Sequence, residues 1–273
     1  MAWLQWSKVG QHFIMQGKNA VSLRDFCLLL IIFSAVFAGI GNARAECAYR
    51  YSQRTSVVQG HKVIVEIYQP EGLRTFPLVF MLHGSAGALR IQPGVEPTSD
   101  NFGEKMLASH CFTVVFPHYL EALGVESLLS QGEMRARSHE LLHAVSQLLD
   151  DAEALPPVRD RPVFLFCQSL GGYLGVTLAL ERPEIAAVSE ISGGLDVTSV
   201  PTRKKLPPLL ISQGEDDRNV PAAEGKWLAS FWRDHGGVVS EHYYKGQTHY
   251  ISSDVLREMV GNTVQFFTYF HQE

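Results

Sequence analysis

The stretch RPVFLFCQSLGGYLGVTLAL, residues 161–180, decides the fold of this chain. Its first part, residues 163–167, is a short apolar run rich in strand-forming residues, as expected of a strand buried in a sheet. Its second part, residues 170–180, is rich in small and apolar residues and predicts a helix. Ser169 lies at the switch between the two parts. The stretch therefore predicts a strand that turns sharply into a helix around a serine.

The side chains around Ser169 are small enough for such a turn. A sharp strand-to-helix turn is strained and brings backbones close together, so it needs small residues two positions before and two after the serine. These positions hold Cys167 and Gly171. The pattern is that of the G-x-S-x-G nucleophile elbow, which lifts a serine hydroxyl above the sheet edge and directs the first helical N–H groups to the same space. An ordinary turn with a serine at a helix N-cap is the alternative.

The composition is that of a globular protein. The chain has 273 residues, of which 46% are hydrophobic and 19% are charged, and it contains no repeats and no low-complexity tract. This length favours one domain once the N-terminus is set aside. We expect that domain to span residues 46–273.

The N-terminus has the features of a secretory signal. Residues 27–40 are almost wholly apolar, follow Lys18 and Arg24, and precede Ala43-Arg44-Ala45. A basic start, an apolar core of about fourteen residues and an A-x-A site are typical of a signal peptide, whereas a membrane span needs about twenty apolar residues. We therefore expect cleavage after Ala45 to remove residues 1–45, and the exported protein to be periplasmic or secreted without stable membrane insertion. An uncleaved N-terminal anchor is the alternative.

Charge and cysteine content limit the possible partners and the redox state. After cleavage the chain would carry 19 Lys and Arg against 27 Asp and Glu, a net charge of −8. An acidic protein of this kind is not expected to bind nucleic acid or an anionic membrane as its main partner. Three cysteines would remain. Cys167 belongs to the buried elbow, so Cys47 and Cys111 are the pair expected to form a disulfide, which an exported protein can keep.

Strands and helices alternate along the rest of the chain, which predicts an α/β fold with a mostly parallel sheet and helices on both faces. The first two strands flank Gln59-Gly60 and predict an antiparallel hairpin at the N-terminal edge of the sheet. The expected strands are residues 49–58, 62–68, 76–82, 111–116, 163–167, 186–191, 208–212 and 238–244. The expected helices are residues 102–109, 133–149, 170–180, 222–235 and 254–270.

Two further polar residues follow strands at the same end of the predicted sheet as Ser169. A serine is a weak nucleophile and needs a base within hydrogen-bond reach. His249 comes after the last strand and Asp217 after the preceding strand, and the order Ser169, Asp217, His249 is the one expected of an α/β-hydrolase. His249 would accept the serine proton, and Asp217 would orient the imidazole. Asp216 and Asp196 are alternative acids.

The same reaction needs two N–H donors aimed at the oxyanion of the tetrahedral intermediate. One would come from Leu170, the residue after the serine, and the other from the glycine-bearing turn 83–87 that follows the strand ending at Leu82. We expect the Ser85 N–H to be the second donor. His83 is expected to order this turn, because His249 fits the role of base better.

Together these motifs resemble the dienelactone hydrolase branch of the α/β-hydrolase superfamily. The matching segments cover the oxyanion loop, the elbow, the acid loop and the base, and they read LHGS (82–85), CQSLGG (167–172), GEDDRNVP (214–221) and GQTH (246–249). The resemblance implies the α/β-hydrolase fold and hydrolysis of a carboxylic ester through an acyl-enzyme. In the family's acid loop the aspartate stands three residues after the glycine and four before the proline, which selects Asp217.

The chain also departs from that branch. Dienelactone hydrolases proper have a cysteine nucleophile at the centre of the elbow, where this chain has Ser169, so their substrate is not carried over. A serine member is more similar to the esterases and peptidase-like members of the branch. Cys167, two residues earlier, is expected to point into the sheet and to be structural.

The loops 86–100, 117–131 and 192–204 are expected to line the substrate pocket, with His83, His118, Tyr119 and Leu195 as candidate contacts. No lid domain is evident, which favours a small ester. The sequence contains no dinucleotide-binding fingerprint, and no metal and no cofactor are expected. Amide or peptide hydrolysis and acyl transfer would use the same triad, and a catalytically silent binding protein could share the fold.

Overall fold

The computed structural model describes residues 46–72, 75–88, 103–156, 158, 161–196 and 199–271. The predicted signal segment, residues 1–45, lies outside the described residues, and so do residues 89–100 of the first predicted pocket loop. Residues Glu46–Glu273 form one compact unit.

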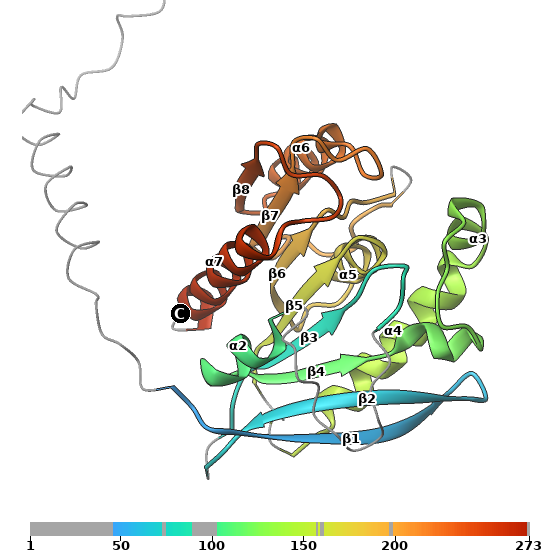
Figure 1. Cartoon of the computed structure of the whole chain (residues 1–273), viewed down its shortest axis with the longest axis vertical. Coiled ribbons are helices and arrows are strands. Elements are labelled where there is room, and N and C mark those ends of the chain that lie inside the picture. Colours follow the sequence, from blue (N-terminus) through green and yellow to red (C-terminus); the bar gives the residue numbers. More distant parts are fainter. Residues whose placement is uncertain are drawn as a thin grey trace, which may run out of the picture. The chain divides into compact units, whose positions relative to one another are not determined.

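Eight strands of the described part of the chain form one sheet, in the order β1-β2-β4-β3-β5-β6-β7-β8 (Figure 1). β1 and β2 form the predicted antiparallel hairpin, β2 also pairs antiparallel with β4, and the remaining neighbours pair in parallel. The strands are β1 (Tyr49–Val58), β2 (His61–Pro70), β3 (Leu78–Leu82), β4 (Thr113–Pro117), β5 (Val163–Gln168), β6 (Ile185–Ile191), β7 (Leu209–Gly214) and β8 (Val239–Tyr244).

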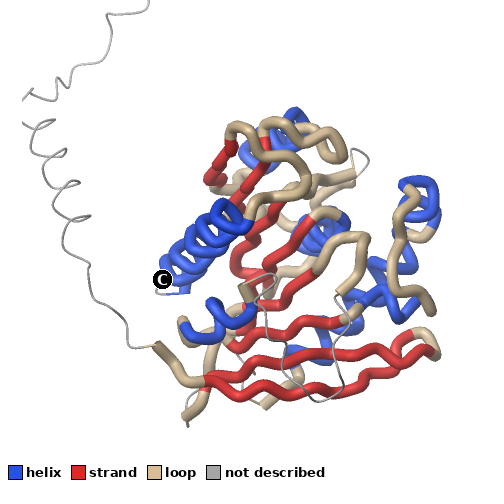
Figure 2. Tube along the Cα trace, in the orientation of Figure 1, coloured by secondary structure: helices blue, strands red, loops and turns tan. Residues whose placement is uncertain are grey.

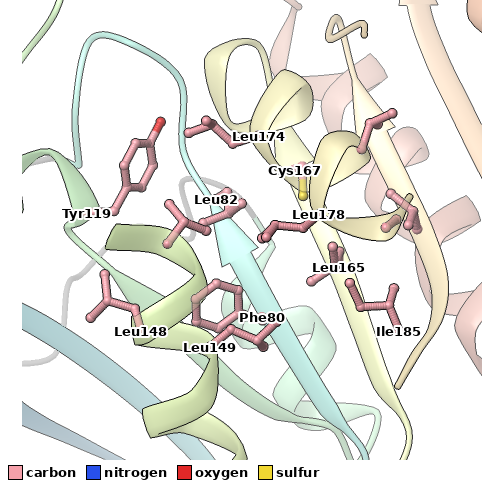
Figure 3. Close-up of a cluster of buried hydrophobic side chains, with 14 of the residues drawn as sticks. Phe80, Leu82, Tyr119, Leu148, Leu149, Leu165, Cys167, Leu174, Leu178 and Ile185 are labelled. Carbon is pink, nitrogen blue, oxygen red and sulfur yellow. The ribbon is translucent and has the colours of Figure 1, made fainter. Parts of the chain in front are cut away.

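Helices cover both faces of this sheet (Figure 2). The apolar central strands supply both cores, because successive side chains of a strand point to opposite faces. Leu78, Phe80 and Leu82 of β3 pack on the side of three helices, α4 (Ser138–Glu153), α5 (Leu170–Ala179) and α6 (Ala222–Asp234). Val79 and Met81 pack on the side of α2 (Glu104–Ser109) and α7 (Ser253–His271). Figure 3 shows Phe80 and Leu82 gathered with Leu148, Leu149 and Leu178 in the first of these cores.

The helix predicted over residues 133–149 is in fact two helices, α3 (Gln131–Ala136) and α4. Arg137 interrupts them with φ −103° and ψ 8°. The Ser138 hydroxyl donates a hydrogen bond of 2.9 Å to the Arg135 carbonyl, and such local side-chain bonds compete with the backbone ladder of a helix. None of the α3 residues is buried, so packing does not force the two segments into one helix.

The predicted loop after β4 is also partly helical. Residues Tyr119–Leu123 form a short 3-10 helix, η1, whose residues Tyr119, Leu120, Ala122 and Leu123 are buried. The pair Cys47 and Cys111 forms a disulfide, with the two Cα atoms 5.4 Å apart. It links the start of the described chain to the turn before β4.

Candidate active site

Ser169 stands between β5 and α5 in a strained backbone conformation, with φ 52° and ψ −117°. A non-glycine residue in such a region costs about 1–3 kcal/mol and persists only where the surroundings fix it. The Ser169 N–H is held by the Ile191 carbonyl of the neighbouring strand at 2.9 Å. A Cβ atom on Gly171 would lie 2.6 Å from the His83 carbonyl oxygen, so only glycine fits there. The elbow therefore has the geometry that its sequence predicts.

The structure brings Ser169, His249 and Asp217 together at the C-terminal ends of the parallel strands. Ser169 Oγ lies 3.0 Å from His249 Nε2, and His249 Nδ1 lies 2.8 Å from Asp217 Oδ2. A carboxylate can only accept, so Nδ1 donates to Asp217, and in the neutral imidazole Nε2 then accepts from the serine hydroxyl. Asp217 is buried, whereas Ser169 and His249 are partly exposed. This arrangement can take a proton from the serine at a face open to a substrate.

Asp217 is held by its own loop. Its Oδ1 accepts hydrogen bonds from the backbone N–H groups of Asn219 and Val220, at 2.8 and 2.9 Å. The neighbouring alternative, Asp216, is exposed. The other alternative, Asp196, is exposed as well. Of the three aspartates considered from the sequence, Asp217 is the one bonded to His249.

The loop after β3 approaches the elbow closely. A Cβ atom on Gly84 would lie 3.3 Å from the Ser169 Cβ, so glycine permits this approach. The His83 carbonyl accepts from the Gly171 N–H at 3.2 Å and from the Tyr119 hydroxyl at 2.8 Å. The Ser85 carbonyl accepts from the Leu128 N–H at 2.8 Å. These bonds fix the loop that carries Ser85 beside Ser169.

His83 itself is buried beneath that loop. Its Nδ1 donates to the Gly84 carbonyl at 2.7 Å, and its ring stacks on Tyr119 with 4.2 Å between ring centroids. Burial lowers the pKa of His83 to about 3, so the imidazole is neutral. The cavity beside it has a volume of about 10 Å³, roughly the space of one water molecule. His83 is therefore placed to order the loop and not to contact a substrate through this cavity.

The predicted pocket contacts His118, Tyr119 and Leu195 are buried in this structure. Tyr119 and Leu195 belong to the core, because η1 and the segment after β6 pack inward. His118 Nε2 pairs with Glu66 Oε1 at 2.8 Å in a buried ion pair. Burial alone would lower the pKa of His118, but the carboxylates of Glu121 and Glu66 raise it to about 9.

Cys167 is buried on the face of the sheet covered by α5 (Figure 3). Burial, with a smaller contribution from the charge of Glu190, raises the pKa of its thiol well above the ordinary value. A thiol in this state is a poor nucleophile. A Cβ atom on Gly175 of α5 would overlap the Cys167 sulfur, so the glycine in the helix matches the extra side chain in the elbow.

Two buried polar residues near the site were not singled out from the sequence. Glu190 of β6 accepts a hydrogen bond from the Gly193 N–H at 2.6 Å, and burial raises its pKa to about 8, partly offset by that bond. Gln213 of β7 donates a hydrogen bond to Asp217. In both cases the sequence shows a charged or amide residue within an apolar strand, and this pattern could have indicated a buried polar residue.

Within the described ranges, no group of three or more His, Cys, Asp or Glu side chains could hold a metal ion. Among the helices of these same residues, none is long and apolar enough to cross a membrane.

Several solved structures are similar to this chain. A Klebsiella pneumoniae protein provisionally described as a dienelactone hydrolase matches with a TM-score of 0.64 and 13% identity, over 81% of this chain and 99% of that one. A dienelactone hydrolase from Anabaena variabilis matches with a TM-score of 0.59 and 18% identity, over 81% and 98%. A hyperthermophilic esterase from Pyrobaculum calidifontis matches with a TM-score of 0.58 and 15% identity, over 90% and 92%.

A scan against protein-family models finds no match, and a search of curated proteins finds none. The structural likeness nevertheless confirms the predicted fold: the chain has the α/β-hydrolase fold. Its structural neighbours include dienelactone hydrolases and esterases.

Proposed function

We propose that this protein is a serine hydrolase that cleaves a carboxylic ester through an acyl-enzyme. The observation that carries the proposal is the continuous hydrogen-bonded chain from Ser169 Oγ through His249 to Asp217. The strained elbow and the similarity in fold to esterases support it.

In the proposed reaction, Ser169 Oγ attacks the ester carbonyl carbon while its proton passes to His249 Nε2. The resulting imidazolium is stabilised by Asp217 through Nδ1–H. His249 then gives the proton to the leaving alcohol oxygen as the carbon–oxygen bond breaks. A water molecule, deprotonated by His249, attacks the acyl-enzyme, and the carboxylic acid leaves as Ser169 regains its proton.

The negative oxygen of each tetrahedral intermediate needs donors fixed in advance. We assign this role to the backbone N–H groups of Leu170 and Ser85. Leu170 is the first residue of α5, and Ser85 follows the glycine that lies against Ser169. The N-terminus of α5 adds a favourable partial charge.

A small ester is the proposed substrate class. The partly exposed Ser169 and His249 favour a substrate whose ester group reaches the C-terminal edge of the sheet directly. Export through residues 1–45 remains part of the proposal, and the disulfide between Cys47 and Cys111 supports it, because such bonds persist in oxidising compartments.

Hydrolysis of p-nitrophenyl acetate, measured beside p-nitroacetanilide, tests the proposal. We expect turnover of the ester, a much slower reaction of the matched amide, and loss of ester turnover in Ser169→Ala. Ser240→Ala, which changes an exposed serine of β8, is the matched control and should keep full activity. Preference for the anilide would indicate an amidase, and equal turnover in wild type and Ser169→Ala would rule out a serine mechanism at this site.

A further inference from the structure

Gln213 is the penultimate residue of β7 and is fully buried. Its side chain lies on the face of the sheet that packs against α6, where it reaches the loop carrying Asp217. The amide nitrogen makes two hydrogen bonds, to Asp217 Oδ2 at 3.1 Å and to the Val220 carbonyl at 2.8 Å. Gln213 therefore ties the end of the strand to both ends of the acid loop.

The orientation of this amide is fixed by its surroundings. Asp217 Oδ2 and the Val220 carbonyl are both acceptors, so a flipped amide would place its oxygen against two other oxygens. In the observed orientation the Gln213 Oε1 has no hydrogen-bond partner among the described residues. The side chain thus leaves its own acceptor unsatisfied while it satisfies Asp217 and Val220.

The bond from Gln213 completes the set of donors around Asp217. Oδ1 receives the N–H groups of Asn219 and Val220, and Oδ2 receives Gln213 Nε2 and His249 Nδ1. A carboxylate has about four lone-pair sites, so every site is used. The backbone N–H groups of Asn219 and Val220 fix Oδ1 of Asp217. The bond from Gln213 limits rotation of Oδ2 toward or away from His249.

We propose that Gln213 is a positioning residue that holds Asp217 Oδ2 in line with His249 Nδ1 for the proposed serine chemistry. The inference rests on the proposed function. Gln213 does not touch the substrate. It acts through Asp217, so its effect on catalysis depends on the carboxylate being present.

A double-mutant cycle with Gln213→Met and Asp217→Ala tests this dependence, with p-nitrophenyl acetate as substrate. Methionine keeps the length of the side chain and removes the donor. In the wild-type background we expect Gln213→Met to lower kcat by about tenfold to a hundredfold, the range for losing a hydrogen bond to a charged group, with KM nearly unchanged. In the Asp217→Ala background the same change should alter kcat by less than about twofold.

The matched control is Ser212→Ala, the preceding residue of β7, whose side chain is buried on the opposite face of the sheet. It should leave kcat unchanged. Equal losses from Gln213→Met in both backgrounds would mean that Gln213 acts on the fold alone and would overturn the inference. Absence of turnover in the wild-type protein would instead overturn the proposed function itself.

If Gln213→Met does not fold, Gln213→Glu is a second variant, and it keeps the shape of the side chain. The new carboxyl can donate to Asp217 Oδ2 only while it is protonated, and once ionised it repels that oxygen. We expect the ratio of its kcat to that of the wild type to fall as the pH rises from 5.5 to 8.5. A constant ratio over this range would overturn the inference.

Discussion

The contact between Cys167 and Gly175 makes a quantitative prediction about the elbow. Cysteine replaces the first glycine of the G-x-S-x-G pattern, and α5 has glycine where the cysteine sulfur packs. Gly175→Ala would place a methyl group onto that sulfur. Overpacking of this kind lowers the free energy of unfolding by about 1–3 kcal/mol. Without such a clash, alanine in place of glycine within a helix raises it by about 1 kcal/mol.

The sulfur is therefore the cause of the expected destabilisation. In the Cys167→Ala protein the sulfur is gone, and the Cβ of residue 167 is then the atom of that residue nearest to a Cβ at position 175. The two Cβ atoms would lie 3.4 Å apart, which is ordinary van der Waals contact. Cys167→Ala alone should cost about 1 kcal/mol for the lost apolar burial. Gly175→Ala should then stabilise the Cys167→Ala protein, although it destabilises the wild type.

Urea unfolding of the four proteins in this cycle measures the coupling. We expect a coupling free energy of about 1–3 kcal/mol between the two positions. Additive changes, within about 0.5 kcal/mol, would refute the argument that the glycine accommodates the cysteine.

Three further predictions concern buried charges and the choice of acid. Because the pKa of Glu190 is raised to about 8, the neutral carboxyl stabilises the folded state at low pH, and this contribution is lost as the pH rises from about 4.5 through 8. In urea unfolding, the free energy of unfolding of Glu190→Gln relative to wild type should therefore increase by roughly 4–5 kcal/mol between pH 4 and pH 9, and a constant difference would contradict this. Because the pKa of His118 is raised to about 9, the protonated imidazole stabilises the folded state fully below about pH 6.5, and this contribution is lost as the pH rises through 9. His118→Gln should therefore lower the free energy of unfolding by about 3 kcal/mol at pH 6 and by little at pH 10, and an equal loss at both pH values would contradict a stabilising charge on His118. Asp217→Asn should lower kcat about 10⁴-fold while Asp216→Asn leaves it unchanged, and the reverse outcome would move the acid to Asp216.

The sheet and the positions of the three chemical groups were predictable because they depend on strong local signals. Continuous apolar runs identify strands buried on both faces, and the carboxyl ends of parallel strands meet at one edge. Ser169 and Asp217 follow such runs, and His249 follows the edge strand β8, so their sequence order and their strand ends were enough to bring them together.

The residues around these groups were harder to predict. His118 and Tyr119 follow a strand and carry polar atoms, which favoured a pocket loop, but a single turn of 3-10 helix directs them into the protein. The break at Arg137 is accompanied by a local hydrogen bond from the Ser138 hydroxyl, which a helical stripe of apolar residues does not reveal. Gln213 is significant only because the acid loop folds back over it, a contact set by tertiary structure.

Intact mass after exposure to a fluorophosphonate, beside the Ser169→Ala variant, is the experiment to perform first. An activated serine attacks this reagent at phosphorus and displaces fluoride, so the wild type should gain the mass of one phosphonyl group. The Ser169→Ala protein should gain none. A folded wild type that remains unmodified, or an equal adduct on both proteins, would show that the chain of hydrogen bonds through His249 to Asp217 does not activate Ser169.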